Sequence, residues 1–210
     1  MTLTDNVLAV FDRASDAERE EGTAWYPLAS RIVTAIAEAT DTDVVRVTYT
    51  LAALSPRNPW LWNVADCYSY ALASREGSPR PTATTFERNR QAAWRAMSQD
   101  GHPWVDAAPK VKAFVAAILG DSEAVVVDIW AYRVAVGHEP TNHGKFRASQ
   151  YEPIAEAYRN AARRRGVTPR TMQAVTWLVA QSEGLASRRK GRHDLVFKRD
   201  TPAFVRTLLA

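Results

Sequence analysis

Cysteine occurs only once in the 210 residues, at Cys67. A single thiol excludes an intramolecular disulfide framework and a cysteine-held iron–sulfur cluster. The four histidines lack the spacing of a metal site, so we expect no bound metal. Glycine is also scarce, with 9 residues, and the chain contains neither a glycine-rich nucleotide loop nor a Gly-x-Ser-x-Gly motif. We therefore expect no cofactor.

Long apolar runs are missing as well. No segment approaches the length needed to cross a bilayer, and the first residues lack the charged and apolar regions of a signal peptide. We therefore expect a cytoplasmic protein with no membrane partner. The formal net charge of +4 is small, but the basic residues are unevenly distributed. The sequence gives no indication of the oligomeric state.

What the sequence does contain is a near-continuous series of helical patterns. Apolar residues recur at helical spacing, and short stretches rich in Gly, Pro, Asp and Thr separate the segments. We expect Gly22 and Thr23 to end the first helix. A series of helices with short turns predicts an all-α architecture. Outside the central stretch, the predicted helices are 3–22, 25–39, 44–54, 60–74, 86–98, 151–165, 168–183 and 201–209.

The central stretch, residues 110 to 137, organises the rest of the chain. It predicts a helix that Gly120 ends, an apolar run over 125–127, and a second helix that begins at Ile129. Asp128 stands at the start of that second helix, where a carboxylate accepts the unpaired N–H groups of the first turn. Its apolar surroundings also make its ionisation sensitive to burial and to nearby cations. Asp128 is therefore either a structural cap or a functional carboxylate.

The segment 127–134, Val-Asp-Ile-Trp-Ala-Tyr-Arg-Val, resembles a pattern of the helix-hairpin-helix DNA glycosylase superfamily. That pattern is Val-Asp-Thr-His-Val-x-Arg-Val-like, and Asp128, Arg133 and the later Gly137 match it. Lys110 stands 18 residues before the aspartate, a spacing that suits members with a Schiff-base lysine. Lys112 is an alternative occupant of that position.

A second segment, 51–58, is similar to the superfamily region that lines the base pocket. Arg57 and Asn58 are suited to hydrogen-bond a base edge or a phosphate. In the alternative interpretation, Asn58 caps the next helix and Arg57 lies in solvent. The aromatic residues expected to stack on a base are Trp25, Tyr26, Trp60, Trp62 and Trp130, although Trp25 and Tyr26 also suit packing at a helix entry.

The resemblance implies a two-lobed, helix-hairpin-helix glycosylase-like fold within one domain. A central lobe would span about 44–137, and a second lobe would combine 1–43 with 138–186, leaving 187–210 as a basic tail with a short helix. The sequence departs from the family at two places. The hairpin before Lys110 contains no glycine, and Ile129 and Trp130 replace the usual Thr-His.

A similar helical layout occurs in phage and actinobacterial proteins and in the superfamily branch that modifies thymine in phage DNA. The resemblance thus implies an enzyme that acts on an everted base of double-stranded DNA. Asp128 would stabilise a cationic sugar or act as a general base, and Lys110 or Lys112 would be a nucleophile. The residues expected to neutralise phosphates are Arg163, Arg164, Arg165, Arg188, Arg189 and Lys190.

Two other hypotheses belong to different functional classes. A non-catalytic DNA-binding or accessory protein would keep only the scaffold, and the missing glycine hairpin and Thr-His pair favour it. A helical domain that binds a small molecule or a protein would carry its basic segments incidentally, because a fold by itself does not fix a function.

Overall fold

The computed structural model describes residues 1–98, 108–137 and 147–187, together with residues 203, 206 and 207. Within these ranges all regular structure is helical, which confirms the all-α prediction. No helix in the described ranges is long and apolar enough to span a membrane. The predicted last helix, 201–209, lies largely outside them. In chain order the elements are α1 (Leu3–Asp12), α2 (Asp16–Thr40), α3 (Val44–Leu54), α4 (Trp60–Glu76), α5 (Glu87–Ser98), α6 (Pro109–Ile118), α7 (Ile129–Val136), η1 (Ala148–Gln150), α8 (Tyr151–Arg165) and α9 (Pro169–Ser187).

The predicted boundary between the first two helices is wrong. Helix α1 ends at Asp12, and α2 begins at Asp16 and continues through Gly22 to Thr40. The break is set by Ser15, whose hydroxyl accepts from the Glu18 N–H at 3.3 Å while the Glu18 carboxylate accepts from the Ser15 N–H at 2.9 Å. This reciprocal pair is a capping box, and its Ser-x-x-Glu signature is visible in the sequence.

Gly22 lies inside α2 because another helix packs against it. A Cβ built on Gly22 would lie 2.5 Å from Cγ2 of Val175 in α9, and 2.8 Å from the Val175 backbone nitrogen. No side chain fits at that distance, so the glycine allows the two helices to approach closely. Gly22 therefore marks a close contact between α2 and α9, not the end of a helix.

The other helix ends in this half of the chain agree with the sequence. Gly137 and Gly166 follow α7 and α8 in the left-handed conformation, with φ of 75° and 64°. Helix α9 begins with Pro169, and the Thr168 hydroxyl accepts from the Thr171 N–H at 3.2 Å. A glycine after the last turn and a proline in the first turn are common signals of helix ends, and both can be read from the sequence.

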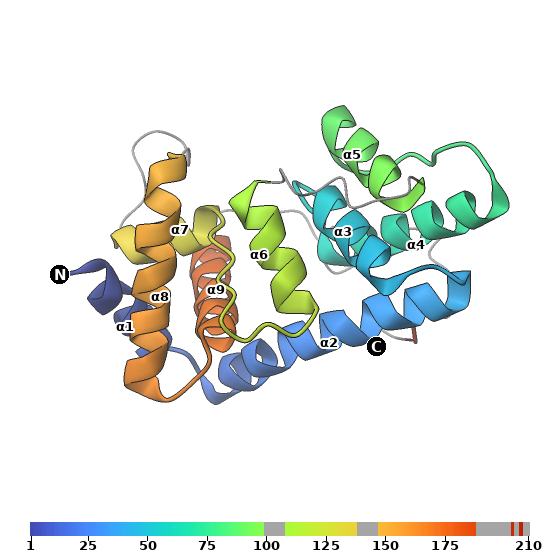
Figure 1. Cartoon of the computed structure of the whole chain (residues 1–210). Coiled ribbons are helices and arrows are strands. Elements are labelled where there is room, and N and C mark those ends of the chain that lie inside the picture. Colours follow the sequence, from blue (N-terminus) through green and yellow to red (C-terminus); the bar gives the residue numbers. More distant parts are fainter. Residues whose placement is uncertain (99–107, 138–146, 188–202, 204–205, 208–210) are drawn as a thin grey trace. The chain divides into compact units, whose positions relative to one another are not determined.

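The chain divides into two compact units. Unit 1 comprises Met1–Leu28 and Lys112–Lys190, and unit 2 comprises Ala29–Val111 and Gly191–Ala210. In unit 1, α1, α7, α8 and α9 pack against one another (Figure 1). Their shared core includes Val7, Phe11, Val127, Tyr158 and Met172, all at most 5 % exposed.

In unit 2, helices α3, α4 and α5 pack together (Figure 1). The buried residues of this unit include Val47, Leu51, Val64, Tyr70 and Met97. The unit boundaries fall after residues 28 and 111, whereas the resemblance predicts lobe boundaries after residues 43 and 137. The difference arises because the apolar run 125–127 and α7 are buried against α1, α8 and α9. Asp128 thus belongs to the unit that contains the first helix.

Candidate functional site

Asp128 is held at the N-terminus of α7 by its own side chain. The buried residues Val125 to Val127 lead into it, and its backbone is extended, with φ of −96° and ψ of −171°. Its carboxylate accepts a hydrogen bond from the Ala131 N–H at 2.8 Å. The expected capping role is therefore confirmed. The side chain is half-buried, so the cap does not seal the carboxylate inside the protein.

Tyr151, the first residue of α8, forms hydrogen bonds with both ends of the apolar run Val125–Val127 that precedes Asp128. Its hydroxyl donates to the carbonyl oxygen of Val125 at 2.9 Å and accepts from the Val127 N–H at 3.3 Å. Burial raises the pKa of Tyr151 to about 12, and the negative charges of Glu152 and Asp128 add to the increase. The neutral hydroxyl thus persists well above neutral pH and keeps both hydrogen bonds.

Two more tyrosines lie within electrostatic range of Asp128. Burial raises the pKa of Tyr26 and of Tyr158 above the usual tyrosine value, and the charge of Asp128 contributes in both cases. The Tyr158 hydroxyl donates to the Ala131 carbonyl at 3.4 Å. We call Asp128, Tyr26, Tyr151 and Tyr158 the Asp128 cluster. Only its aspartate and Tyr26 are predicted site residues, because Tyr151 and Tyr158 fit the sequence equally well as core residues of a helix.

Tyr26 is a structural member of this cluster. Its hydroxyl donates to Oε1 of Gln173 at 2.7 Å, and the residue is only 3 % exposed. The Arg170 guanidinium lies 5.8 Å from its ring centroid. Tyr26 is thus enclosed by its neighbours and offers no open face on which a base could stack, contrary to the expected role.

Of the tryptophans predicted to stack on a base, Trp60 and Trp62 are half-buried in the first turn of α4 in unit 2. The other two lie in unit 1 and have different surroundings. Trp25 is half-buried in an aromatic cluster, with ring centroids 4.8 Å from Tyr26 and 6.1 Å from Trp177. This is the helix-entry packing that the sequence allows. Trp130 stands two residues after Asp128, is half-buried, and lies 5.0 Å from the guanidinium of Arg133. Of the two, only Trp130 lies on the same helix turn as the aspartate.

Both candidate lysines lie in the first turn of α6. Lys110 is half-buried and Lys112 is exposed. Lys112 and Asp128 belong to unit 1, whereas Lys110 belongs to unit 2. The role of either lysine as a Schiff-base nucleophile stays a prediction.

The three arginines at the end of α8 form ion pairs within unit 1. Each one has a carboxylate partner: Arg163 pairs with Glu156 at 3.0 Å, Arg164 with Asp5 at 3.4 Å and Arg165 with Asp12 at 2.5 Å. Two of these pairs connect α8 to α1. The arginines are thus partly neutralised, and a phosphate would have to replace the carboxylates. The other predicted phosphate ligands, Arg188, Arg189 and Lys190, lie outside the described residues.

Arg57 and Asn58 lie in the α3–α4 loop of unit 2. The Asn58 side chain donates to Oδ2 of the buried Asp66 at 2.9 Å, and the cap position of α4 is occupied by Pro59. Asn58 therefore does not cap the next helix. Arg57 is exposed, and its guanidinium lies 5.2 Å from the ring centroid of Phe86. Phe86 is not among the predicted site residues, because it lies 29 positions after Arg57 and the sequence does not indicate that the two side chains meet.

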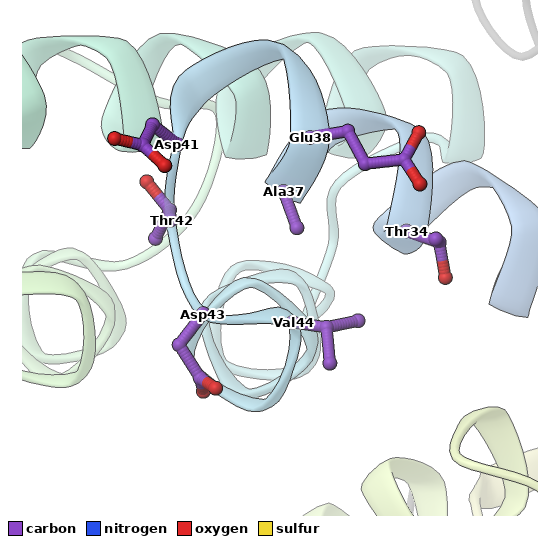
Figure 2. Close-up of a pocket in the computed structure, with 7 residues that line it drawn as sticks. All are labelled: Thr34, Ala37, Glu38, Asp41, Thr42, Asp43 and Val44. Atoms are coloured by element: carbon purple, nitrogen blue, oxygen red, sulfur yellow. The ribbon is translucent and has the colours of Figure 1, made fainter.

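A pocket of about 390 Å³ lies elsewhere in unit 2. Figure 2 shows its lining, which comes from the end of α2, the following turn and the start of α3. The acidic side chains there are Glu38, Asp41 and Asp43, and Asp43 caps α3 by accepting from the Arg46 N–H at 3.0 Å. None of the predicted site residues in the described ranges lines this pocket. Within the described ranges, no group of three or more His, Cys, Asp or Glu residues is placed to hold a metal.

Comparison with known proteins places the chain in a family without assigning it an activity. No curated protein and no solved structure matched the chain. One family model matches residues 1–184, which includes the Asp128 cluster and all of α1 to α8. The chain therefore belongs to the family described as "Family of unknown function (DUF7178)".

Proposed function

We propose that this protein binds double-stranded DNA and acts on a base turned out of the duplex, with Asp128 as the reacting carboxylate. The observation that carries the proposal is the position of Asp128, a half-buried carboxylate fixed at the N-terminus of α7 by the Ala131 N–H. The resemblance of residues 127–134 to the glycosylase pattern supports the assignment of this residue.

Asp128 stands at the N-terminus of α7. The positive end of the α7 dipole stabilises a negative charge there, and the Ala131 N–H donates directly to the carboxylate. An ionised carboxylate can stabilise the cationic sugar that forms when a base leaves. It can also take a proton from an incoming amine in a transfer reaction. Both reactions need the base outside the stack, which costs a few kcal/mol of unstacking.

Trp130 supports the binding of such a base. It is half-buried on the same helix turn as Asp128 and is contacted by the Arg133 guanidinium. An indole ring beside a cation is a good stacking surface, since stacking of a base on an aromatic side chain contributes about 1–3 kcal/mol. The predicted carboxylate and its stacking partner thus lie two residues apart.

The arginines of α8 remain suited to bind the DNA backbone. Their ion pairs are exposed, and exposed pairs contribute only about 0–1 kcal/mol each. A phosphate can therefore replace a carboxylate partner at little cost. Binding of this kind weakens as salt increases, because each contact releases counterions from the DNA.

The second candidate is a non-catalytic DNA-binding or accessory protein. It is favoured by the hydrogen bond from the Ala131 N–H to Asp128, because capping alone is a sufficient reason for an aspartate at this position. The two candidates differ in what happens when the carboxylate is removed but the cap is kept.

Substitutions at Asp128 separate these roles. Asparagine and serine cap helices about as well as aspartate, whereas alanine loses about 1 kcal/mol of stability. We therefore expect Asp128→Asn and Asp128→Ser to fold normally and to bind duplex DNA, but to lose base release or base modification. Asp128→Ala should lose activity and stability together. Assays on damaged and phage DNA measure product, and thermal unfolding measures stability. An Asp128→Asn variant with unreduced turnover would refute the catalytic role, and an inactive wild type that binds DNA would favour the accessory protein.

A further inference from the structure

A partly apolar, cationic patch lies on unit 2, where the α3–α4 loop meets the segment before α5. Phe86 is 42 % exposed, which is unusual among the large apolar side chains that the structure describes. Two guanidinium groups lie over its ring, that of Arg57 at 5.2 Å and that of Arg88 at 5.6 Å from the centroid. We call these three residues the Arg57–Phe86–Arg88 patch.

The two chain segments that carry the patch are fastened to each other. The Thr85 hydroxyl donates to the Pro56 carbonyl at 2.7 Å. The buried Asp66 carboxylate accepts from the Thr84 N–H at 3.1 Å and from the Asn58 side chain at 2.9 Å. Residues directly beside Arg57 and Phe86 are therefore held by side-chain hydrogen bonds. The patch is positioned before any ligand arrives, which reduces the ordering cost of binding.

Arg57 also occupies an unfavourable backbone conformation. Its φ is +59°, in the left-handed region that costs free energy for a residue with a Cβ. Glycine or asparagine would adopt this turn more easily. The turn itself does not need an arginine there, and a strained position of this kind is a reason to look for a functional role of its side chain.

The patch keeps an excess of positive charge. The nearest carboxylate in sequence, Glu87, is engaged by two other arginines, with Arg80 and Arg90 both at 2.7 Å. In the described part of the chain, no carboxylate forms an ion pair with Arg57 or Arg88. Two guanidinium groups thus remain for an external anion, next to an exposed aromatic ring.

We propose that the Arg57–Phe86–Arg88 patch binds single-stranded nucleic acid. Guanidinium groups pair with phosphates, and flat guanidinium and phenyl groups stack against unpaired bases, so the patch offers both contacts that a single strand requires. An acidic peptide would use only the charges. The inference deepens the proposed function by naming a surface for unpaired nucleotides, and it rests on that function for the choice of DNA as the nucleic acid.

The test is binding of a labelled single-stranded oligonucleotide to the full chain, followed by fluorescence anisotropy. We expect Phe86→Ala to weaken binding roughly 5- to 160-fold, the range set by one base–aromatic stack. Phe86→Leu should weaken it nearly as much, because leucine keeps the apolar volume but not the ring. Arg57→Gln and Arg88→Gln should each lower the dependence of affinity on salt by about 0.7 in log–log slope. Arg31→Gln, which removes the same charge from an exposed position of α2, is the matched control.

The outcomes separate this inference from the proposed function. Loss of binding in the patch variants, with Arg31→Gln unchanged, supports the patch even if no DNA preparation is a substrate. Unchanged binding in all patch variants refutes the patch, even if Asp128-dependent turnover is found. Competition by poly-glutamate that equals competition by an unlabelled oligonucleotide would also refute it, since the patch would then recognise charge alone.

Discussion

Replacing Gly22 by alanine tests the helix contact that the sequence does not reveal. The new Cβ would lie 2.5 Å from Cγ2 of Val175 and 2.8 Å from its backbone, so rotation of the valine side chain cannot relieve the clash and α9 must shift. Overpacking of this kind costs about 1–3 kcal/mol. Alanine is about 1 kcal/mol better than glycine in a helix interior, which offsets part of that cost. The difference is a net loss of about 0–2 kcal/mol in the free energy of unfolding, and we expect the upper half of that range because the Val175 backbone itself must move.

Urea unfolding followed by circular dichroism measures this loss. Ala24→Gly is the matched control, because Ala24 is exposed in the same helix and reports the helix propensity alone. Its expected cost is about 1 kcal/mol, and adding that value to the loss in Gly22→Ala isolates the overpacking term. If Gly22→Ala is as stable as the wild type or more stable, α2 and α9 do not approach as closely as the structure indicates.

Two further predictions concern unit 1. Tyr151→Phe removes the hydrogen bonds to Val125 and Val127 and should lower the free energy of unfolding, measured in urea, by about 1–3 kcal/mol. An unchanged free energy of unfolding would mean that water replaces the hydroxyl. The hydrogen bond from Arg165 lowers the pKa of Asp12 below its usual value of 3.8. The ion pair therefore stabilises the folded protein above pH 3.8, and this stabilisation is lost as the pH falls through the lowered pKa. Thermal unfolding of Arg165→Gln and wild type should thus differ near neutral pH and converge in acid, and a difference that grows in acid would contradict the assignment.

At the candidate site, the sequence predicts contacts within one helix turn but not contacts between distant segments. Asp128 was recognised as a cap because capping depends only on residues within one helix turn, and Ala131 is three positions away. The enclosure of Tyr26 could not be seen in the same way. It depends on Gln173 and Arg170, which come from a helix about 145 positions further along the chain. The sequence thus identifies the carboxylate but not the side chains around it.

The spacing of apolar residues in the sequence determined the all-α class. The sequence also determined the caps of α7 and α9 and the glycines that end α7 and α8, because neighbouring residues alone satisfy the free N–H and C=O groups of a helix end. The tertiary structure alone decided that Gly22 is a helix contact, that the arginines of α8 are paired with carboxylates, and that Arg57 meets Phe86. The physical reason is that packing and ion pairing act between groups close in space, and spacing along one chain does not specify which distant segments meet.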